Sequence, residues 1–125
     1  MQRWAELLAR YLSCYHKPRN QYSRDMNDFN EIINSEKPTL VDFFATWCGP
    51  CRMQGPILEQ VKKNVGEDAN VIKVDIDQNR DAAMRYRVQS VPTLIVFVKG
   101  EAVWRGVGVH QADQLEAKLR EHMAK

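Results

Sequence analysis

The spacing of apolar residues along the chain predicts helices and strands in a regular order. In residues 2–16 the apolar side chains recur at helical spacing and form one stripe, which indicates an amphipathic helix. Residues 17–24 are polar, contain Pro18, and are typical of a linker or an irregular edge segment. From residue 25 onward the expected order is helix, strand, helix, strand, helix, two strands and a final helix.

The elements expected after residue 25 alternate in a way that fixes the fold class. A strand, a helix and a second strand in succession imply parallel pairing with a right-handed crossover. A glycine-containing turn between the last two strands makes them an antiparallel hairpin. We therefore expect an α/β domain with a mixed sheet, built from a helix at 25–35, strands at 39–45 and 70–76, a helix after Cys51, a short helix at 77–87, strands at 93–98 and 101–107, and a helix at 111–123.

Two of the expected helices carry finer predictions. In the helix after Cys51, Pro56 should introduce a kink because proline has no backbone N–H. The residues expected to face inward from this helix are Met53, Ile57, Leu58, Val61 and Val65. Asp77 is expected to cap the short helix that follows the second strand.

Composition and charge narrow the function classes. A chain of 125 residues with 44% hydrophobic residues fits one globular domain, and no apolar run approaches the roughly 18 residues that span a bilayer. The net charge of +2 argues against strong nucleic-acid binding. Residues 1–24 contain five basic side chains and one acidic, so the remainder carries −2. Glu6 and Arg10 interrupt the first apolar stretch, which excludes a secretory signal peptide there.

Two of the three cysteines, Cys48 and Cys51, have the spacing of a redox pair at the start of a helix. The helix N-terminus lowers the pKa of a thiol, so Cys48, expected at an exposed lip, is the candidate nucleophile. Cys51, one turn further in, can resolve the mixed disulfide. Half of a zinc site is the alternative, but no second paired spacing supplies the other ligands. We therefore expect no metal; the remaining candidate ligands would be Cys14, His16, His110 and His122.

Asp42 is the one polar residue inside an otherwise apolar strand. Burial of a carboxyl raises its pKa, and a carboxyl that titrates near neutral pH can serve as a general base for Cys51. A structural carboxylate with a local hydrogen bond is the other interpretation, and the sequence does not decide between the two.

The segment Val41–Cys51 resembles the active-site segment of the thioredoxin family, with Trp-Cys-Gly-Pro-Cys intact. The resemblance extends over about residues 25–125 and implies a thioredoxin fold with four or five strands. It implies that Asp42 is the family's buried aspartate, that Lys73 lies near it, and that Pro92 is a cis-proline. A solvated strand residue is the alternative interpretation of Lys73. The contact surface implied for substrates consists of Trp47, Gly49, Pro50, Val91, Pro92 and Gly108.

The chain departs from the family pattern at its beginning, so we divide it into an extension, 1–24, and a thioredoxin domain, 25–125. The family's first strand would be short, irregular or absent in residues 17–24. Helix 2–16 could be an added core element, a partner or dimer contact, a membrane-surface helix, or the remnant of a targeting segment. Cys14 is expected to be an inert thiol, with a regulatory disulfide as the alternative. Phe44 stands where many family members have tryptophan.

The resemblance implies a protein-disulfide reductase with no cofactor besides its own disulfide. Its partners would be disulfide-containing proteins and a reductase that regenerates the dithiol. Few cysteines suit a reducing compartment, so we expect a cytoplasmic monomer that binds no nucleic acid. A disulfide oxidant or isomerase outside the cytoplasm, and a binding module switched by its redox state, are the alternatives.

Overall fold

The computed structural model describes residues 26–123 of the chain. The expected helix 2–16, the segment 17–24 and Cys14 lie outside these residues. The described elements follow the predicted order, with one added 3₁₀ turn: α2 Met26–Ile33, β1 Thr39–Phe44, α3 Gly49–Val65, η1 Gly66–Asp68, β2 Asn70–Asp75, α4 Arg80–Arg85, β3 Thr93–Val98, β4 Glu101–Val107 and α5 Ala112–Glu121.

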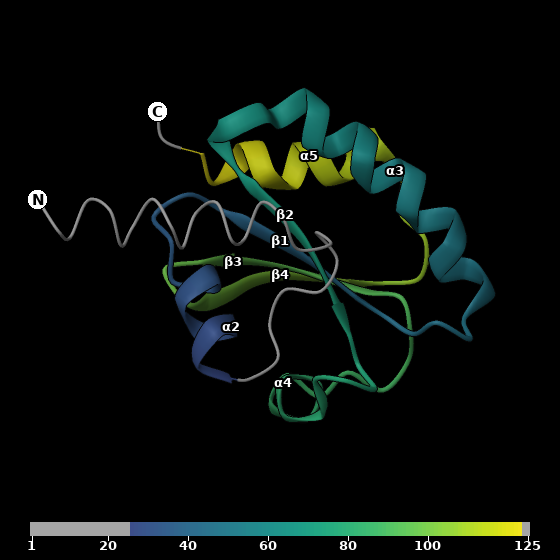
Figure 1. Ribbon diagram of the computed structural model, residues 1–125. Helices are drawn as coiled ribbons and strands as arrows, with labels where there is room; N and C mark the ends of the chain where they lie inside the picture. Colours follow the sequence, from purple (N-terminus) through teal and green to yellow (C-terminus); the bar gives the residue numbers. More distant parts are fainter. Residues whose placement is uncertain (1–25, 124–125) are drawn as a thin grey trace, which may run out of the picture.

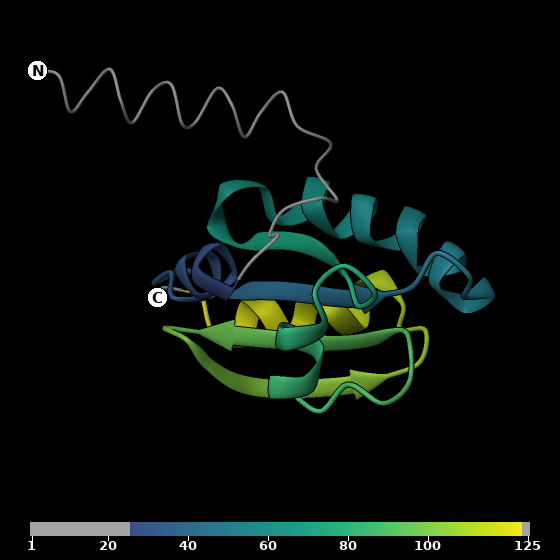
Figure 2. The ribbon, with the colours of Figure 1, turned by 60° about the horizontal axis from the view of Figure 1, so that its bottom comes forward.

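The described strands form one mixed four-stranded sheet in the order β2-β1-β3-β4 (Figure 2). Strand β1 pairs in parallel with β2, as the crossover through α3 requires, and antiparallel with β3. The hairpin partner β4 completes the sheet, with a register shift between Val96 and Phe97. The number of strands agrees with the expected four or five.

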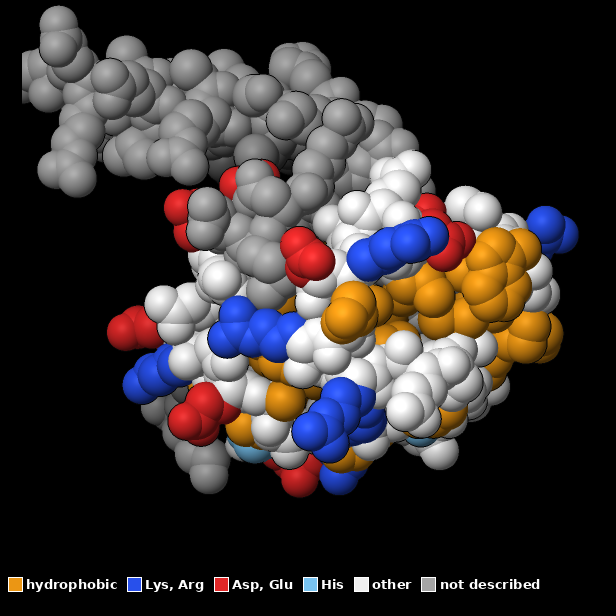
Figure 3. All heavy atoms as spheres, turned by 90° about the horizontal axis from the view of Figure 1, so that it is seen from below, with side chains coloured by type: hydrophobic (Ala, Val, Ile, Leu, Met, Phe, Trp, Pro, Cys, Tyr) orange, Lys and Arg blue, Asp and Glu red, His pale blue; other side chains and the backbone are white. Residues whose placement is uncertain are grey.

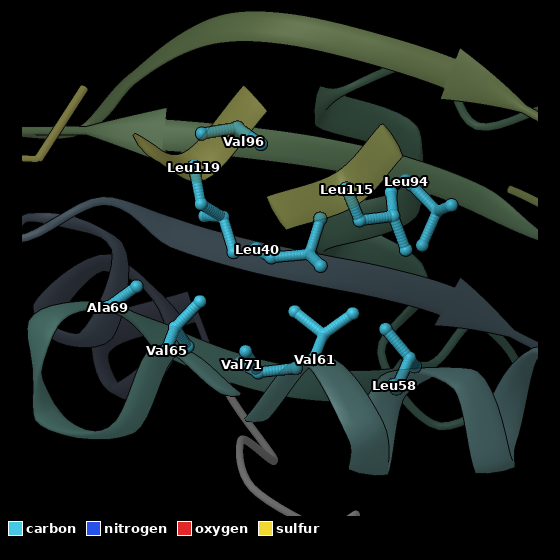
Figure 4. Close-up of a cluster of buried hydrophobic side chains, with 10 residues drawn as sticks. All are labelled: Leu40, Leu58, Val61, Val65, Ala69, Val71, Leu94, Val96, Leu115 and Leu119. Atoms are coloured by element: carbon cyan, nitrogen blue, oxygen red, sulfur yellow. The ribbon is translucent and has the colours of Figure 1, made fainter. Parts of the chain in front are cut away.

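Helices cover both faces of this sheet (Figure 1). Helices α3 and α5 lie on one face, and α2 and α4 lie on the other. Because side chains alternate along a strand, Leu40 of β1 packs in the core beneath α3 and α5, and Val41 packs in the core on the opposite face of the sheet. The core beneath α3 and α5 is drawn in Figure 4; it consists of Leu40, Leu58, Val61, Val65, Ala69, Val71, Leu94, Val96, Leu115 and Leu119.

Several element boundaries differ from the prediction by one to three residues, and two of the differences can be followed to particular contacts or residues. Helix α2 ends at Ile33 and not at residue 35, because carbonyl groups at this end of the helix accept hydrogen bonds from the β3–β4 turn. The amides of Lys99 and Gly100 donate to the carbonyls of Ser35 and Ile33. Helix α4 begins at Arg80, so the prediction that Asp77 caps it is wrong.

The inward face of α3 also differs from the prediction. Pro56 lies inside the helix as expected. Of the residues predicted to face inward, Met53 is 65% exposed and Ile57 is only partly buried. The buried residues of this helix are Cys51, Gln54, Leu58, Val61 and Val65. A polar residue, Gln54, therefore takes a position on the buried face that the apolar pattern had assigned to its neighbour.

Candidate active site at the start of α3

The sequence places Cys48 at the junction where strand β1 has ended and helix α3 begins. Cys48 is the N-cap residue of α3 and has extended backbone angles, φ −94° and ψ 117°. Its Sγ accepts a hydrogen bond from the backbone N–H of Cys51 at 3.2 Å. Pro50 lies in the first helical turn, where its missing N–H removes no helical hydrogen bond. Cys48 and Cys51 form a disulfide across 5.3 Å between Cα atoms.

The two sulfur-bearing residues are equally shielded in this oxidised form. Cys48 is 4% exposed and Cys51 is 3% exposed, so the expectation that Cys48 lies at an exposed lip is wrong for the disulfide state. Val91 packs against the pair, and its carbonyl oxygen lies 3.6 Å from Cys48 Sγ. The covering segment comes from the loop before β3, about 40 residues away in sequence, which local patterns do not reveal.

That covering segment carries the cis peptide bond between Val91 and Pro92. The backbone N–H of Gly108 donates to the carbonyl of Pro92 at 2.8 Å. Gly108 has φ +90°, a backbone conformation that side-chain-bearing residues rarely adopt, which explains the need for glycine there. The structure thus brings Val91, Pro92 and Gly108 together beside the disulfide.

The rim of the site is apolar and exposed. Trp47 is 68% exposed, although its indole N–H donates to the Asp77 carboxylate at 3.0 Å. This contact is what Asp77 does in place of capping α4. Gly49 and Pro50 are also exposed next to the pair. Figure 3 shows hydrophobic side chains gathered at the end of the molecule where β1 leads into α3.

Asp42 lies beneath this region in β1, paired in register with Lys73 of β2. It is fully buried, and neither of its carboxyl oxygens has a hydrogen-bond partner among the described residues. The local hydrogen bond that a structural carboxylate would need is therefore not among the described contacts. Burial raises the pKa of Asp42 from 3.8 to about 7, and the positive charge of Lys73 offsets part of that rise.

Lys73 is placed next to Asp42 by the pairing of β1 with β2. Its ammonium group lies 4.6 Å from the centroid of the Phe44 ring, an arrangement that favours the cation electrostatically. The expectation that Lys73 is a neighbour of the buried aspartate agrees with this register, and the side chain is only partly exposed.

Sequence reasoning missed one buried polar contact near the site. Gln54 is fully buried and forms two hydrogen bonds with the backbone of His110, one in each direction. The available signal was its spacing: Gln54 follows Cys51 by three residues, so the two lie on the same face of a helix.

Within residues 26–123 no group of three or more histidine, cysteine, aspartate or glutamate side chains is arranged to hold a metal ion. Nor does any helix in this part of the chain have the length and apolarity needed to cross a membrane.

The sequence and the fold were compared with those of known proteins. Residues 21–121 match the family model described as thioredoxin. A thioredoxin-like protein of Synechocystis is 48% identical over 94 residues, covering 74% of this chain and 90% of that protein. A thioredoxin of Alicyclobacillus acidocaldarius is 40% identical over 92 residues, covering 74% of this chain and 88% of that protein.

Solved structures give the same result for the fold. The X-ray structure of Fasciola hepatica thioredoxin superposes with a TM-score of 0.72 at 36% identity, covering 79% of this chain and 95% of that one. A mutant thioredoxin from Halobacterium salinarum gives a TM-score of 0.73 at 30% identity and covers 87% and 97%. The mixed sheet with helices on both faces is therefore the thioredoxin fold.

The raised pKa of Asp42 predicts how stability depends on pH. The folded protein keeps this proton up to about pH 7, whereas the unfolded chain loses it near pH 3.8. The free energy of unfolding should therefore fall by about 4 kcal/mol as pH rises through this interval, and then level off. Asp42→Asn removes this dependence, so its effect on stability should be more favourable at about pH 8 than at about pH 4.5 by about 3 kcal/mol, since part of the change is already complete at pH 4.5.

Urea unfolding of the oxidised protein at the two pH values measures this difference. Asp113→Asn, which changes an exposed aspartate in the first turn of α5, is the matched control. It loses a favourable charge at the helix N-terminus, about 0.3–1 kcal/mol, but its effect should differ between the two pH values by less than about 0.5 kcal/mol. An Asp42→Asn effect of equal size at both pH values would contradict the raised pKa.

Proposed function

Because the chain belongs to the thioredoxin family and is a thiol–disulfide oxidoreductase, we propose that it reduces disulfides of other proteins through the Cys48–Cys51 pair. The observation that carries the proposal is the position of this pair, at the N-terminus of α3 and against the Val91–Pro92 segment. A thiolate placed there is stabilised by the helix dipole and by free backbone N–H groups.

In the first step the Cys48 thiolate attacks one sulfur of a substrate disulfide. The substrate S–S bond breaks, a bond forms between Cys48 Sγ and the attacked sulfur, and the other substrate sulfur leaves as a thiolate. The Cys51 N–H already donates to Cys48 Sγ in the oxidised form, which supports its role as a donor to the reduced sulfur.

In the second step Cys51 attacks Cys48 Sγ and releases the remaining substrate sulfur as a thiolate. The Cys48–Cys51 disulfide forms again, and the two electrons that the pair loses reduce the substrate to a dithiol. We propose that Asp42 accepts the Cys51 proton, because a buried carboxyl with a pKa of about 7 is half ionised at neutral pH. Lys73 tunes that carboxyl through its charge.

Substrates would dock on the exposed rim formed by Trp47, Gly49 and Pro50, with backbone contacts at Val91, Pro92 and Gly108. The apolar character of this end supports a protein substrate over a small polar one. A separate reductase of the thioredoxin-reductase type would return the pair to the dithiol, and we propose that the protein acts as a monomer.

We propose a cytoplasmic location, and no cofactor other than the redox-active disulfide. Three cysteines, of which two form the reactive pair, suit a reducing compartment better than a secreted domain held together by disulfides. Fractionation of cells with an antibody against the protein would test the location, and recovery outside the cytoplasm would contradict it.

Serine variants of the three cysteines should separate the roles. With insulin as the substrate, Cys48→Ser should leave no turnover above background, because the nucleophile is gone. Cys51→Ser should form a mixed disulfide through Cys48 that persists, since nothing resolves it. Mass spectrometry of the non-reduced protein detects this adduct.

Cys14→Ser is the matched control and should retain the unchanged rate. Full insulin reduction by Cys48→Ser, or an adduct on Cys14 in place of Cys48, would show that the nucleophile has been assigned wrongly.

A role for Asp42 as base predicts a pH profile. The carboxylate is the active form, so the rate at which the mixed disulfide resolves should rise with pH through about 7. Asp42→Asn should lower that rate by at least about tenfold and remove the step near pH 7, because general base catalysis typically contributes about 10²–10⁴-fold. Quenched-flow detection of the adduct measures the resolving step, and an unchanged profile in the variant would rule out the assigned base.

A further inference from the structure

We infer that Gln54 is a positioning residue, which ties helix α3 to the Gly108 segment and thereby sets the rate with protein disulfides but not with small disulfides. The inference rests on the proposed reduction of protein substrates and names a residue that this reaction depends on. Gln54 touches neither sulfur; it acts through the backbone of a neighbouring segment.

The side-chain amide of Gln54 both donates a hydrogen bond to His110 and accepts one from it. Nε2 donates to the carbonyl oxygen of His110 at 3.0 Å, and Oε1 accepts from the backbone N–H of His110 at 2.9 Å. Gln54 is fully buried, so water cannot replace these bonds readily. The pair therefore fixes the segment between β4 and α5 at a set distance from the helix that carries Cys51.

His110 is itself held by its neighbours, so its contact with Gln54 fixes the position of the whole segment around Gly108. Its Nδ1 lies 2.8 Å from the carbonyl oxygen of Gly108, and its ring meets Trp104 edge-on at 5.4 Å between centroids. Both rings close over Gly106, where an added Cβ would lie 2.5 Å from Trp104 and 2.7 Å from His110. The tight packing leaves this segment little freedom to shift while Gln54 holds it.

These contacts form a ring that begins and ends at α3. Gln54 binds His110, His110 contacts Gly108, and the Gly108 N–H donates to the carbonyl of Pro92 at 2.8 Å. Val91, the neighbour of Pro92, places its carbonyl 3.6 Å from Cys48 Sγ at the start of the same helix. These polar contacts, from Gln54 through His110, Gly108 and Pro92 to Val91, form a closed circuit beside the redox pair.

Protein disulfides and small disulfides should depend on this circuit to different extents. A protein substrate must lay its backbone along the Val91–Pro92 and Gly108 segments, so loosening them should slow its reaction. A small disulfide needs only access to the Cys48 thiolate. Loss of the Gln54 bonds should therefore separate the two activities, whereas a general loss of folded protein would lower both together.

The test compares Gln54→Met with the unchanged protein. Methionine keeps the length and flexibility of the side chain but makes neither hydrogen bond. Pre-reduced protein, freed of reductant, is mixed with insulin or with hydroxyethyl disulfide, and formation of the Cys48–Cys51 disulfide in one turnover is followed by acid quenching and mass spectrometry. We expect the insulin rate to fall by about five- to tenfold, because docking on the loosened segment should lose about the free energy of one hydrogen bond.

The hydroxyethyl disulfide rate and the equilibrium constant of the pair with dithiothreitol should stay within about twofold, because the chemistry at the sulfurs is unchanged. The matched control is Gln60→Met on the same helix, which replaces an exposed glutamine whose amide contacts Asn64, and it should alter neither rate. Equal loss of both rates in Gln54→Met, or no loss of either, would overturn the inference.

A measurement on the unchanged protein covers the case in which Gln54→Met does not fold. Hydrogen exchange resolved by NMR should show slow exchange at the backbone amides of His110 and Gly108, since both donate in the circuit. Exchange of the His110 amide at the rate of an unprotected one would overturn the inference. If the unchanged protein reduces hydroxyethyl disulfide but not insulin, the proposed function fails and the inference fails with it.

Discussion

The position of Cys48 as the N-cap of α3 is the constraint on which the rest of the site depends. A short turn after β1 leaves this residue in extended conformation, and the helix that follows presents the backbone N–H of Cys51 to the sulfur. The same start of the helix places Cys51 one turn further along, at 5.3 Å between Cα atoms, where a disulfide closes without unwinding the helix. Without the abrupt change from strand to helix, neither the capped sulfur nor the pairing would exist.

The site also contains a feature that lowers stability above neutral pH. Asp42 occupies a buried position of β1 that an apolar residue would fill without any electrostatic penalty. Its ionised form is unfavourable in the fold, which is the physical meaning of a pKa of about 7. Groups with strongly shifted pKa values are typical of active sites. Lys73, next to it in the register, limits the penalty without removing it.

Much of this molecule could be predicted from local patterns, because its strands are short apolar runs bounded by turns. The run at Thr93–Val98 matches its strand residue for residue. Contacts between distant segments could not be predicted this way. Cys48 is as buried as Cys51 because Val91 packs against the pair. Gln54 faces inward, where Met53 was expected, because its amide binds the backbone of His110, which lies 56 residues later in the sequence. Periodicity indicates which face of a helix is apolar, but it does not show where a buried polar group finds its partner.

The direction of the reaction is the central claim, and the equilibrium reduction potential of the Cys48–Cys51 pair tests it most directly. The protein, with Cys14 changed to serine, would be equilibrated against dithiothreitol and glutathione buffers, and the fraction of disulfide measured. A reductase predicts a potential near about −270 mV, the value known for thioredoxin, which is more negative than the glutathione poise of about −220 to −260 mV obtained by extraction. A potential near about −180 mV, or less negative, is typical of isomerases and oxidants and would contradict a reductase.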